Sequence, residues 1–353
     1  MRLGSLTTRP HRDPLHARNA VAFALLYAIT VAACSSGTPS QSVAPGVGTT
    51  ATFILANPGG LSALDDAGRL LGKVVKLPDQ SAPSTPSLHP SGTLIAFSLT
   101  GQADAKRGFG SDIYTVNLDG TGLKSILLHE DNNVFYASPR FDASGNVLYV
   151  HRRAAVITNG TYTGNDDAIV RVDLRTNMTT RLIKDGADPT ISPDGKTIVY
   201  VHLKDSQVDA LWRADIDGAN AAPLIKGKDA FWYLQAPRFS PAACQMVFSA
   251  AGHTVGEARS GATYALSHSA DGTGQRLAHL SVPSELFLVP CDGSSLKSVG
   301  QTGDDVVPAW SPDGTRIAYV GSGGFFVLDV KTQTTHTVAQ GQDFFFGDLV
   351  WIK

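Results

Sequence analysis

Residues Pro308–Tyr319 read PAWSPDGTRIAY, and variants of this phrase recur along the chain. A close copy, PTISPDGKTIVY, begins at Pro189, and looser copies begin at Pro86, Pro139 and Pro237. Successive copies start 48 to 71 residues apart. A repeat of this length has room for four short strands, which is typical of a β-propeller blade.

Each repeat predicts two β-hairpins. The Pro-Asp-Gly or Pro-Ser-Gly segment predicts a tight turn, because glycine accepts a positive φ and aspartate bonds to the backbone of its own turn. A β-branched and aromatic strand follows this turn, as at residues 197–201. The second hairpin turns at an Asp-Gly pair in three repeats, at Asp119, Asp217 and Asp292.

The two ends of the repeat region complete one further blade. Residues 52–75 contain the pattern of three strands without a preceding first strand, and residues 348–352 read as a first strand with no blade after it. Pairing these segments would close a ring and remove exposed sheet edges. We therefore predict an all-β fold over residues 51–353: a six-bladed β-propeller of four-stranded blades, closed by pairing of the N- and C-terminal strands.

The Pro-x-Trp-Ser-Pro-Asp-Gly phrase resembles the WD40-like Pro-Asp repeat of the TolB family of bacterial β-propellers. The resemblance spans residues 50–353 and is weakest at Pro237, where Ala242, Ala243 and Cys244 stand in place of Asp-Gly. TolB itself carries a separate N-terminal α/β domain, for which this chain has no room. The resemblance implies a propeller-only relative with a protein-contact role, and it does not imply membership of the Tol envelope system.

The N-terminus predicts export and lipidation. A basic start with four arginines precedes the apolar stretch Ala20–Val31, and the sequence Val-Ala-Ala-Cys ending at Cys34 matches a bacterial lipobox. We expect residues 1–33 to be a lipoprotein signal peptide and Cys34 to carry the lipid. Residues 34–50 are rich in Ser, Gly, Pro and Thr, which predicts a flexible tether. An ordinary secretory signal and an uncleaved anchor are the alternatives.

The residues after Cys34 and the net charge bear on localisation and partners. Ser35 and Ser36, rather than Asp, follow Cys34. By analogy with lipoprotein sorting, we expect an anchor in the outer membrane facing the periplasm, or in the outer leaflet of the cell membrane of a one-membrane bacterium. The whole chain has a formal charge of −2. Nucleic-acid binding would require a basic face, which this charge does not indicate, so we expect no nucleic-acid partner. We expect a monomer that binds an envelope protein or peptide.

The cysteines predict a disulfide. If Cys34 carries lipid, Cys244 and Cys291 remain in an exported protein, where disulfides persist. Cys244 lies at the first hairpin turn of its repeat, and Cys291 lies just before the second. These turns share one end of an up-and-down blade, so we expect the two residues to be bonded. Two unpaired buried thiols are the alternative.

The opposite end of the ring carries the long loops, at residues 101–111, 152–167 and 252–283, together with the connections between blades. Loops and aromatic residues are favoured at binding sites. We expect this end to bind a partner through aromatic clusters and two arginines: Phe135, Tyr136, Phe231, Trp232, Tyr233, Phe344, Phe345, Phe346, Arg140 and Arg238. The alternatives are aromatic wedges between blades and arginines paired with Asp188, Asp304 or Asp305.

The sequence gives little indication of an enzyme. The sequence contains no Gly-x-Ser-x-Gly elbow, no His-Glu-x-x-His, no phosphate loop and no Cys-x-x-Cys. His253, His268 and His279 share the long insertion, but their spacing alone predicts no metal site, and we expect no cofactor. We favour a non-enzymatic scaffold that binds a protein or peptide. The alternative is a carbohydrate- or lactone-active lyase or hydrolase that uses the channel mouth.

Overall fold

The fold is almost entirely β-sheet, as the sequence predicts. The computed structural model describes residues 46–225, 231–252, 284–321, 323–345 and 347–353, which belong to one compact unit. Strands β1–β24 are accompanied in these ranges by one short helix, α1 (Val47–Thr50), and one 3-10 turn, η1 (Gln342–Phe344). None of the helices in these ranges is long and apolar enough to cross a membrane.

Four of the sheets have four antiparallel strands each. The first contains β24 (Asp348–Trp351), β1 (Phe53–Asn57), β2 (Gly60–Leu64) and β3 (Leu70–Lys73), in that order. The second contains β12 (Gly186–Ile191), β13 (Thr197–Lys204), β14 (Gln207–Asp215) and β15 (Ala222–Pro223). The third contains β16 (Tyr233–Phe239), β17 (Gln245–Ala251), β18 (Glu285–Pro290) and β19 (Lys297–Gln301). The fourth contains β20 (Ala309–Trp310), β21 (Arg316–Gly321), β22 (Gly324–Asp329) and β23 (Thr334–Gln340).

The number of separate sheets differs from the six predicted. Eight strands join in one sheet: β4 (Ala82–Leu88), β5 (Leu94–Thr100), β6 (Gly110–Asn117), β7 (Lys124–Leu127), β8 (Val134–Phe141), β9 (Val147–Thr158), β10 (Thr161–Asp173) and β11 (Thr179–Lys184). The cause is a short parallel pairing of β6 with β8, in which Gly110 meets Val134 and Ser111 meets Phe135. This pairing fuses two antiparallel runs, β4–β7 and β8–β11, that the repeat pattern treats as separate.

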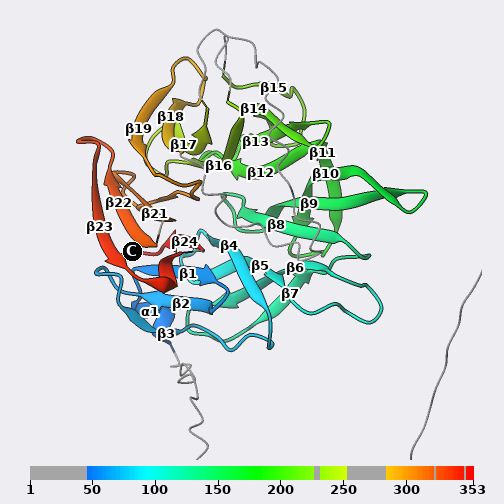
Figure 1. Cartoon of the computed structure of the whole chain (residues 1–353), viewed down its shortest axis with the longest axis horizontal. Coiled ribbons are helices and arrows are strands. Elements are labelled where there is room, and N and C mark those ends of the chain that lie inside the picture. Colours follow the sequence, from blue (N-terminus) through cyan, green and yellow to red (C-terminus); the bar gives the residue numbers. More distant parts are fainter. Residues whose placement is uncertain (1–45, 226–230, 253–283, 322, 346) are drawn as a thin grey trace, which may run out of the picture. The chain divides into compact units, whose positions relative to one another are not determined.

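The sheets follow one another in chain order around a ring (Figure 1). Their opening strands contact one another in the closed cycle β24–β4–β8–β12–β16–β20–β24. The predicted terminal closure is confirmed, because β24 pairs antiparallel with β1 and places Val350 opposite Ile54. Residues 46–50, which we expected in the tether, lie against the propeller: the Gly46 N–H donates to the Asp119 carbonyl at 3.0 Å, and Val47 packs on a buried cluster.

The Ser-Pro-Asp-Gly phrase forms its turn through side-chain bonds. The Ser311 hydroxyl donates to Asp313 Oδ1 at 2.5 Å, and the Thr315 N–H donates to the same oxygen at 3.0 Å. The hydrogen bond from Ser311 lowers the pKa of Asp313 to about 2. Gly314 follows with a φ of 68°, a conformation that favours glycine. The motif therefore encodes the turn locally.

A belt of buried hydrogen bonds connects the opening strands of neighbouring repeats. The Thr85 N–H donates to Asp348 Oδ2 at 2.8 Å, and the Ser138 N–H donates to Thr85 Oγ1 at 3.0 Å. The Ser138 hydroxyl donates to Asp188 Oδ1 at 2.5 Å, and the Ala236 N–H donates to Asp188 Oδ2 at 3.4 Å. Four of these residues precede a proline and have a φ of 45° to 51°. Their backbone strain is held in place by the contacts between repeats.

The predicted disulfide is confirmed. Cys244 and Cys291 are bonded, their Cα atoms lie 5.4 Å apart, and 47 positions separate them in the sequence. The bond ties the turn between β16 and β17 to the end of β18. It therefore stabilises the repeat whose first turn lacks the Asp-Gly pair.

Removing this disulfide should destabilise the propeller. The double variant Cys244→Ser, Cys291→Ser is expected to lose about 2–4 kcal/mol of unfolding free energy, because the unfolded chain regains the entropy of an open loop. Urea unfolding of the oxidised wild type and of the double variant measures the difference. Wild type unfolded in the presence of a reductant should match the double variant, and equal midpoints for all three samples would contradict the prediction.

Candidate functional site

The long loops gather at one end of the ring. The parallel pairing of β6 with β8 places the segment before Gly110 beside the segment before Val134. The Asn133 N–H donates to the Phe109 carbonyl at 2.6 Å, and the Ala155 N–H donates to the Asn133 carbonyl at 3.1 Å. We call the surface formed by residues 101–109, 128–133 and 152–167 the long-loop face.

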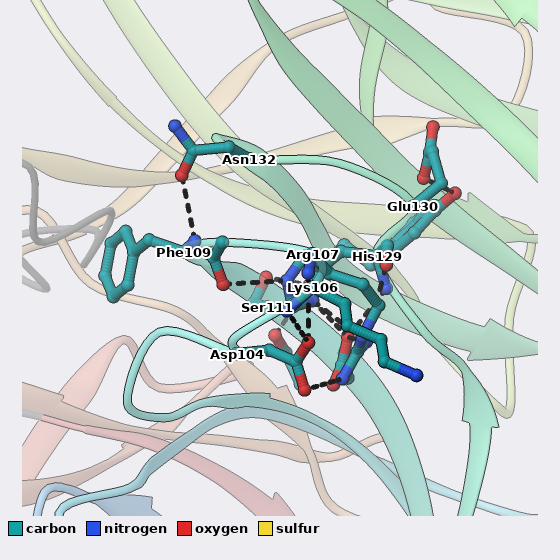
Figure 2. A network of polar contacts seen from close by, with 12 residues as sticks. Asp104, Lys106, Arg107, Phe109, Ser111, His129, Glu130 and Asn132 are labelled. Carbon is teal, nitrogen blue, oxygen red and sulfur yellow. Dashed lines mark hydrogen bonds and ion pairs between the residues drawn. The ribbon is translucent and has the colours of Figure 1, made fainter.

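A polar network fastens the 101–109 loop to the start of β6, as Figure 2 shows. Asp104 Oδ1 accepts hydrogen bonds from the backbone N–H groups of Lys106 and Arg107, both at 2.9 Å. The Arg107 guanidinium donates to Asp112 Oδ1 at 3.2 Å. The Phe109 N–H donates to Asn132 Oδ1 at 2.9 Å, which joins this loop to the one before β8.

His129 lies at the centre of this network and is 4% exposed. Its Nδ1 lies 2.6 Å from Asp112 Oδ1, and its Nε2 lies 3.3 Å from the Gly108 carbonyl oxygen. The His129 backbone N–H also donates to Asp112 Oδ1, at 2.7 Å. Because both ring nitrogens are engaged in a buried site, this histidine is suited to holding loops together rather than to proton transfer with a substrate.

A second set of ion pairs fixes the base of the β9–β10 hairpin. The Arg152 guanidinium bridges Glu130 Oε1 at 2.6 Å and Asp166 Oδ2 at 3.2 Å. Arg181 binds the other oxygen of Asp166 at 2.5 Å. The Tyr136 hydroxyl donates to Glu130 Oε2 at 2.9 Å, and burial together with this bond raises the pKa of Tyr136. The base of the hairpin is therefore rigidly positioned.

The hairpin itself extends beyond this base as a two-stranded arm (Figure 1). Sequence reasoning treated residues 152–167 as a loop, but the strand pairing continues to Thr158 and Thr161. No residue in the range 154–165 is charged. Ile157 and Tyr162 are cross-strand partners near the tip and are 54% and 55% exposed. The sequence signal for this arm was the uncharged run 154–165 between two pairs of charged residues, at 152–153 and 166–167.

Comparison with known proteins identifies the fold. No protein-family model matches the sequence, and a search among curated proteins gives no match either. A solved structure described as a TolB from Agrobacterium tumefaciens is 18% identical, with a TM-score of 0.52, and the alignment covers 74% of this chain and 83% of that one. For TolB from Acinetobacter baumannii the identity is 16%, the TM-score 0.58, and the coverage 85% and 65%. The chain has a TolB-like β-propeller fold.

The same fold occurs in an enzyme. A puromycin hydrolase variant is 15% identical, with a TM-score of 0.51, and the alignment covers 81% of this chain and 43% of the hydrolase. The TolB-like chain spans less than two thirds of the Acinetobacter protein and less than half of the hydrolase. At these identities the likeness concerns the fold, so the function has to be argued from the site.

In this TolB-like propeller, several of the predicted binding aromatics belong to the core. Phe231 is 2% exposed, and its ring centroid lies 5.1 Å from that of Phe287 and 5.5 Å from that of Phe248. Phe344 is 7% exposed and stacks on Phe325. Tyr136 is also buried, so these side chains have the wedge role that was the alternative interpretation.

Other predicted aromatics are accessible. Trp232 is 39% exposed and Phe345 is 50% exposed. Phe135 is half-buried against Phe109, with ring centroids 5.6 Å apart. The half-buried Tyr233 donates its hydroxyl to Gln235 Oε1 at 2.8 Å. Phe346 lies outside the described residues. A Cβ atom at Gly252, just after β17, would contact Trp232, and one at Gly323, between β21 and β22, would contact Phe345. In the strand order these positions correspond to the β9–β10 turn, so the exposed members lie at the ring end that carries the long-loop face.

The two repeated arginines of the TolB-like propeller turn back on their own backbone. Arg140 donates to the Pro139 carbonyl at 2.8 Å, and Arg238 donates to the Pro237 carbonyl at 2.7 Å. Arg140 is buried and Arg238 is half-buried. The equivalent geometry at equivalent repeat positions supports a structural role for both guanidinium groups.

Two further histidines pair with carboxylates. His151 Nε2 lies 2.7 Å from Asp167 Oδ1, and His202 Nδ1 lies 2.9 Å from Asp209 Oδ2. In the part of the chain that the structure describes, no group of three or more His, Cys, Asp or Glu side chains is arranged to hold a metal ion. His253, His268 and His279 lie outside that part.

Proposed function

We propose that this TolB-like propeller is a non-enzymatic scaffold that binds a protein or peptide through its long-loop face. The β9–β10 hairpin carries the proposal, because it presents Ile157 and Tyr162 side by side on a base fixed by ion pairs. Exposed apolar side chains on a rigid support are favoured at protein contacts, where preorganisation lowers the entropy cost of binding. Trp232 and Phe345 add aromatic surface at the same end of the ring.

We further propose that a lipid on Cys34 tethers the scaffold to the cell envelope. Cys34 and most of residues 34–50 lie outside the described residues, so the sequence alone supports the anchor. The lipobox and the uncharged tether place the propeller outside the cytoplasm in this proposal. The disulfide between Cys244 and Cys291 fits such an oxidising compartment.

We also infer that the fused eight-stranded sheet functions as two blades, which gives the ring six. The pairing between β6 and β8 involves only two residues on each strand. The cycle of opening strands supports the same count, because it contains one strand from each repeat. Each blade can then offer its own loops to a partner.

The alternative of a carbohydrate- or lactone-active enzyme requires accessible acid–base groups at the channel mouth. The His–Asp pairs of the first and second repeats are instead buried: His129 and His151 are each 4% exposed and bonded to a carboxylate. Their geometry supports the binding proposal over the catalytic one.

Site-specific photo-crosslinking in intact cells tests the proposed face. A photoreactive phenylalanine in place of Tyr162 is expected to give a discrete protein adduct, because the hairpin tip would lie within the interface. The same probe in place of Met178 is a matched control, since Met178 is 66% exposed but lies between β10 and β11, at the other end of β10 from Tyr162.

In the same experiment, Cys34→Ala should release the protein from the membrane fraction and weaken the adduct at position 162. Equal adducts from positions 162 and 178, or none from position 162 in folded and correctly localised protein, would refute the long-loop face as the binding surface.

A further inference from the structure

A cavity of about 310 Å³ lies at the closure of the ring, and none of its lining residues belongs to the long-loop face. Residues of the first sheet form most of its wall, and residues 342–344 of η1 complete it. A volume of this size suits a small organic ligand. Its lining includes Leu55, Asn57, Ser62, Lys73, Asp343 and Phe344.

Lys73 supplies the positive charge of this cavity. It lies opposite Ser62 in the pairing of β2 with β3, and its Nζ donates to Ser62 Oγ at 2.8 Å. A Cβ atom at Gly59 would lie 3.2 Å from Nζ, so the glycine leaves room for the ammonium group. Burial lowers the pKa of Lys73, and the charge of Asp343 partly opposes this shift.

Asp343 supplies the negative charge. Its backbone carbonyl accepts a hydrogen bond from Asn57 Nδ2 at 3.2 Å, which ties η1 to the end of β1. The Asp343 side chain is exposed, and the Lys73 ammonium donates to Ser62 rather than directly to Asp343. The cavity therefore combines two opposite charges with the apolar side chain of Leu70, which lines it and is 45% exposed.

We propose that this cavity binds a free α-amino acid with an apolar side chain. The Lys73 ammonium would bind the ligand's carboxylate, the Asp343 carboxylate would bind its ammonium group, and the exposed Leu70 would contact its side chain. A zwitterion pairs with both charges at once, whereas a ligand with a single charge forms only one of the two charge-assisted contacts.

Ligand binding would also strengthen the closure of the ring. The cavity is lined by residues 55–73 from the start of the propeller and by residues 342–344 from its end. A ligand that contacts both segments binds only the folded ring, so it stabilises that state by mass action. Binding and thermal stability should therefore rise together.

Calorimetric titration of the full-length protein with L-leucine tests the proposal. We expect saturable binding of L-leucine and at least about tenfold weaker binding of L-leucinamide and of N-acetyl-L-leucine, each of which lacks one charge. Lys73→Met should weaken L-leucine binding by at least about tenfold and leave L-leucinamide binding unchanged. Asp343→Asn should instead remove the preference for L-leucine over N-acetyl-L-leucine.

Lys76→Met is the matched control, because Lys76 is exposed, lies three positions from Lys73 and does not line the cavity. It should bind L-leucine like wild type. Asp343→Asn keeps the test decisive if Lys73→Met fails to fold, since Asp343 is exposed. Absence of saturable binding and of any rise in Tm at ~10 mM L-leucine, or equal L-leucine affinity in wild type and both cavity variants, would overturn the proposal.

Discussion

Phe231→Ala is expected to lower the free energy of unfolding by about 3–5 kcal/mol. The residue begins a run of three aromatic residues, but its side chain is 2% exposed and contacts Phe248 and Phe287. It belongs to a buried cluster that also includes Met246 and Val289. Truncation would leave a cavity that this packed cluster can fill only in part, which is the origin of the large cost.

The neighbouring residue provides the control for this experiment. Trp232→Ala removes a larger ring that is 39% exposed, so the expected loss is about 1 kcal/mol or less. Urea unfolding followed by circular dichroism compares the two variants under one condition. If Phe231→Ala were no less stable than Trp232→Ala, the assignment of Phe231 to the core would be wrong.

The contrast between these neighbours shows where sequence reasoning reaches its limit. Both residues are large and aromatic, and both precede β16, so composition gives no reason to separate them. Which ring turns inward depends on packing against β17 and β18, whose residues come later in the chain. Aromatic clusters between blades can therefore be located from sequence, but their exposed members cannot be selected.

Local chemistry was more informative for the turns. The bonds from Ser311 and Thr315 to Asp313 lie within five residues of sequence, so the repeat carries its own turn. The pairing of β24 with β1 was predictable for a related reason, since each terminal segment lacked the strands that the other supplied. Repetition therefore established the propeller without any long-range information.

Contacts between repeats were the part that could not be predicted. The belt from Asp348 through Thr85 and Ser138 to Asp188 requires a positive φ at residues before proline, which local preference disfavours. The fusion of β6 with β8 rests on two residue pairs. Four of the belt residues share the position before a repeat's opening proline, but their types differ (Thr, Ser, Asp and Ala), so the repeat pattern marks the position without indicating the bonds made there.

Asp167→Ala is expected to cost about 3–5 kcal/mol of unfolding free energy, since it leaves a buried charge network without its acceptor. The Asp167 side chain is 2% exposed, and its Oδ1 lies 2.7 Å from both His151 Nε2 and Arg153 Nε. Burial alone would raise the pKa of Asp167, but the hydrogen bonds from His151 and Arg153 and the charge of Arg153 outweigh burial and lower it. The adjacent Asp166 is the matched control: its side chain is 36% exposed, so Asp166→Ala should cost about 1 kcal/mol or less.

The His151–Asp167 pair should make the free energy of unfolding decrease as the pH falls. Burial lowers the pKa of His151 below its usual 6.5, and the attraction of Asp167 only partly offsets this. As the pH falls below 6.5 the unfolded chain binds a proton at this histidine while the folded chain does not, so the unfolding free energy decreases. The lowered pKa of Asp167 adds a further loss, which begins near the carboxylate's unfolded pKa and is complete once the pH passes below its folded pKa. Urea midpoints measured at pH 7 and pH 5 should differ less in His151→Gln than in wild type, because the variant lacks the titrating group. An unchanged difference between the two midpoints would show that His151 contributes nothing to the acid sensitivity of this propeller.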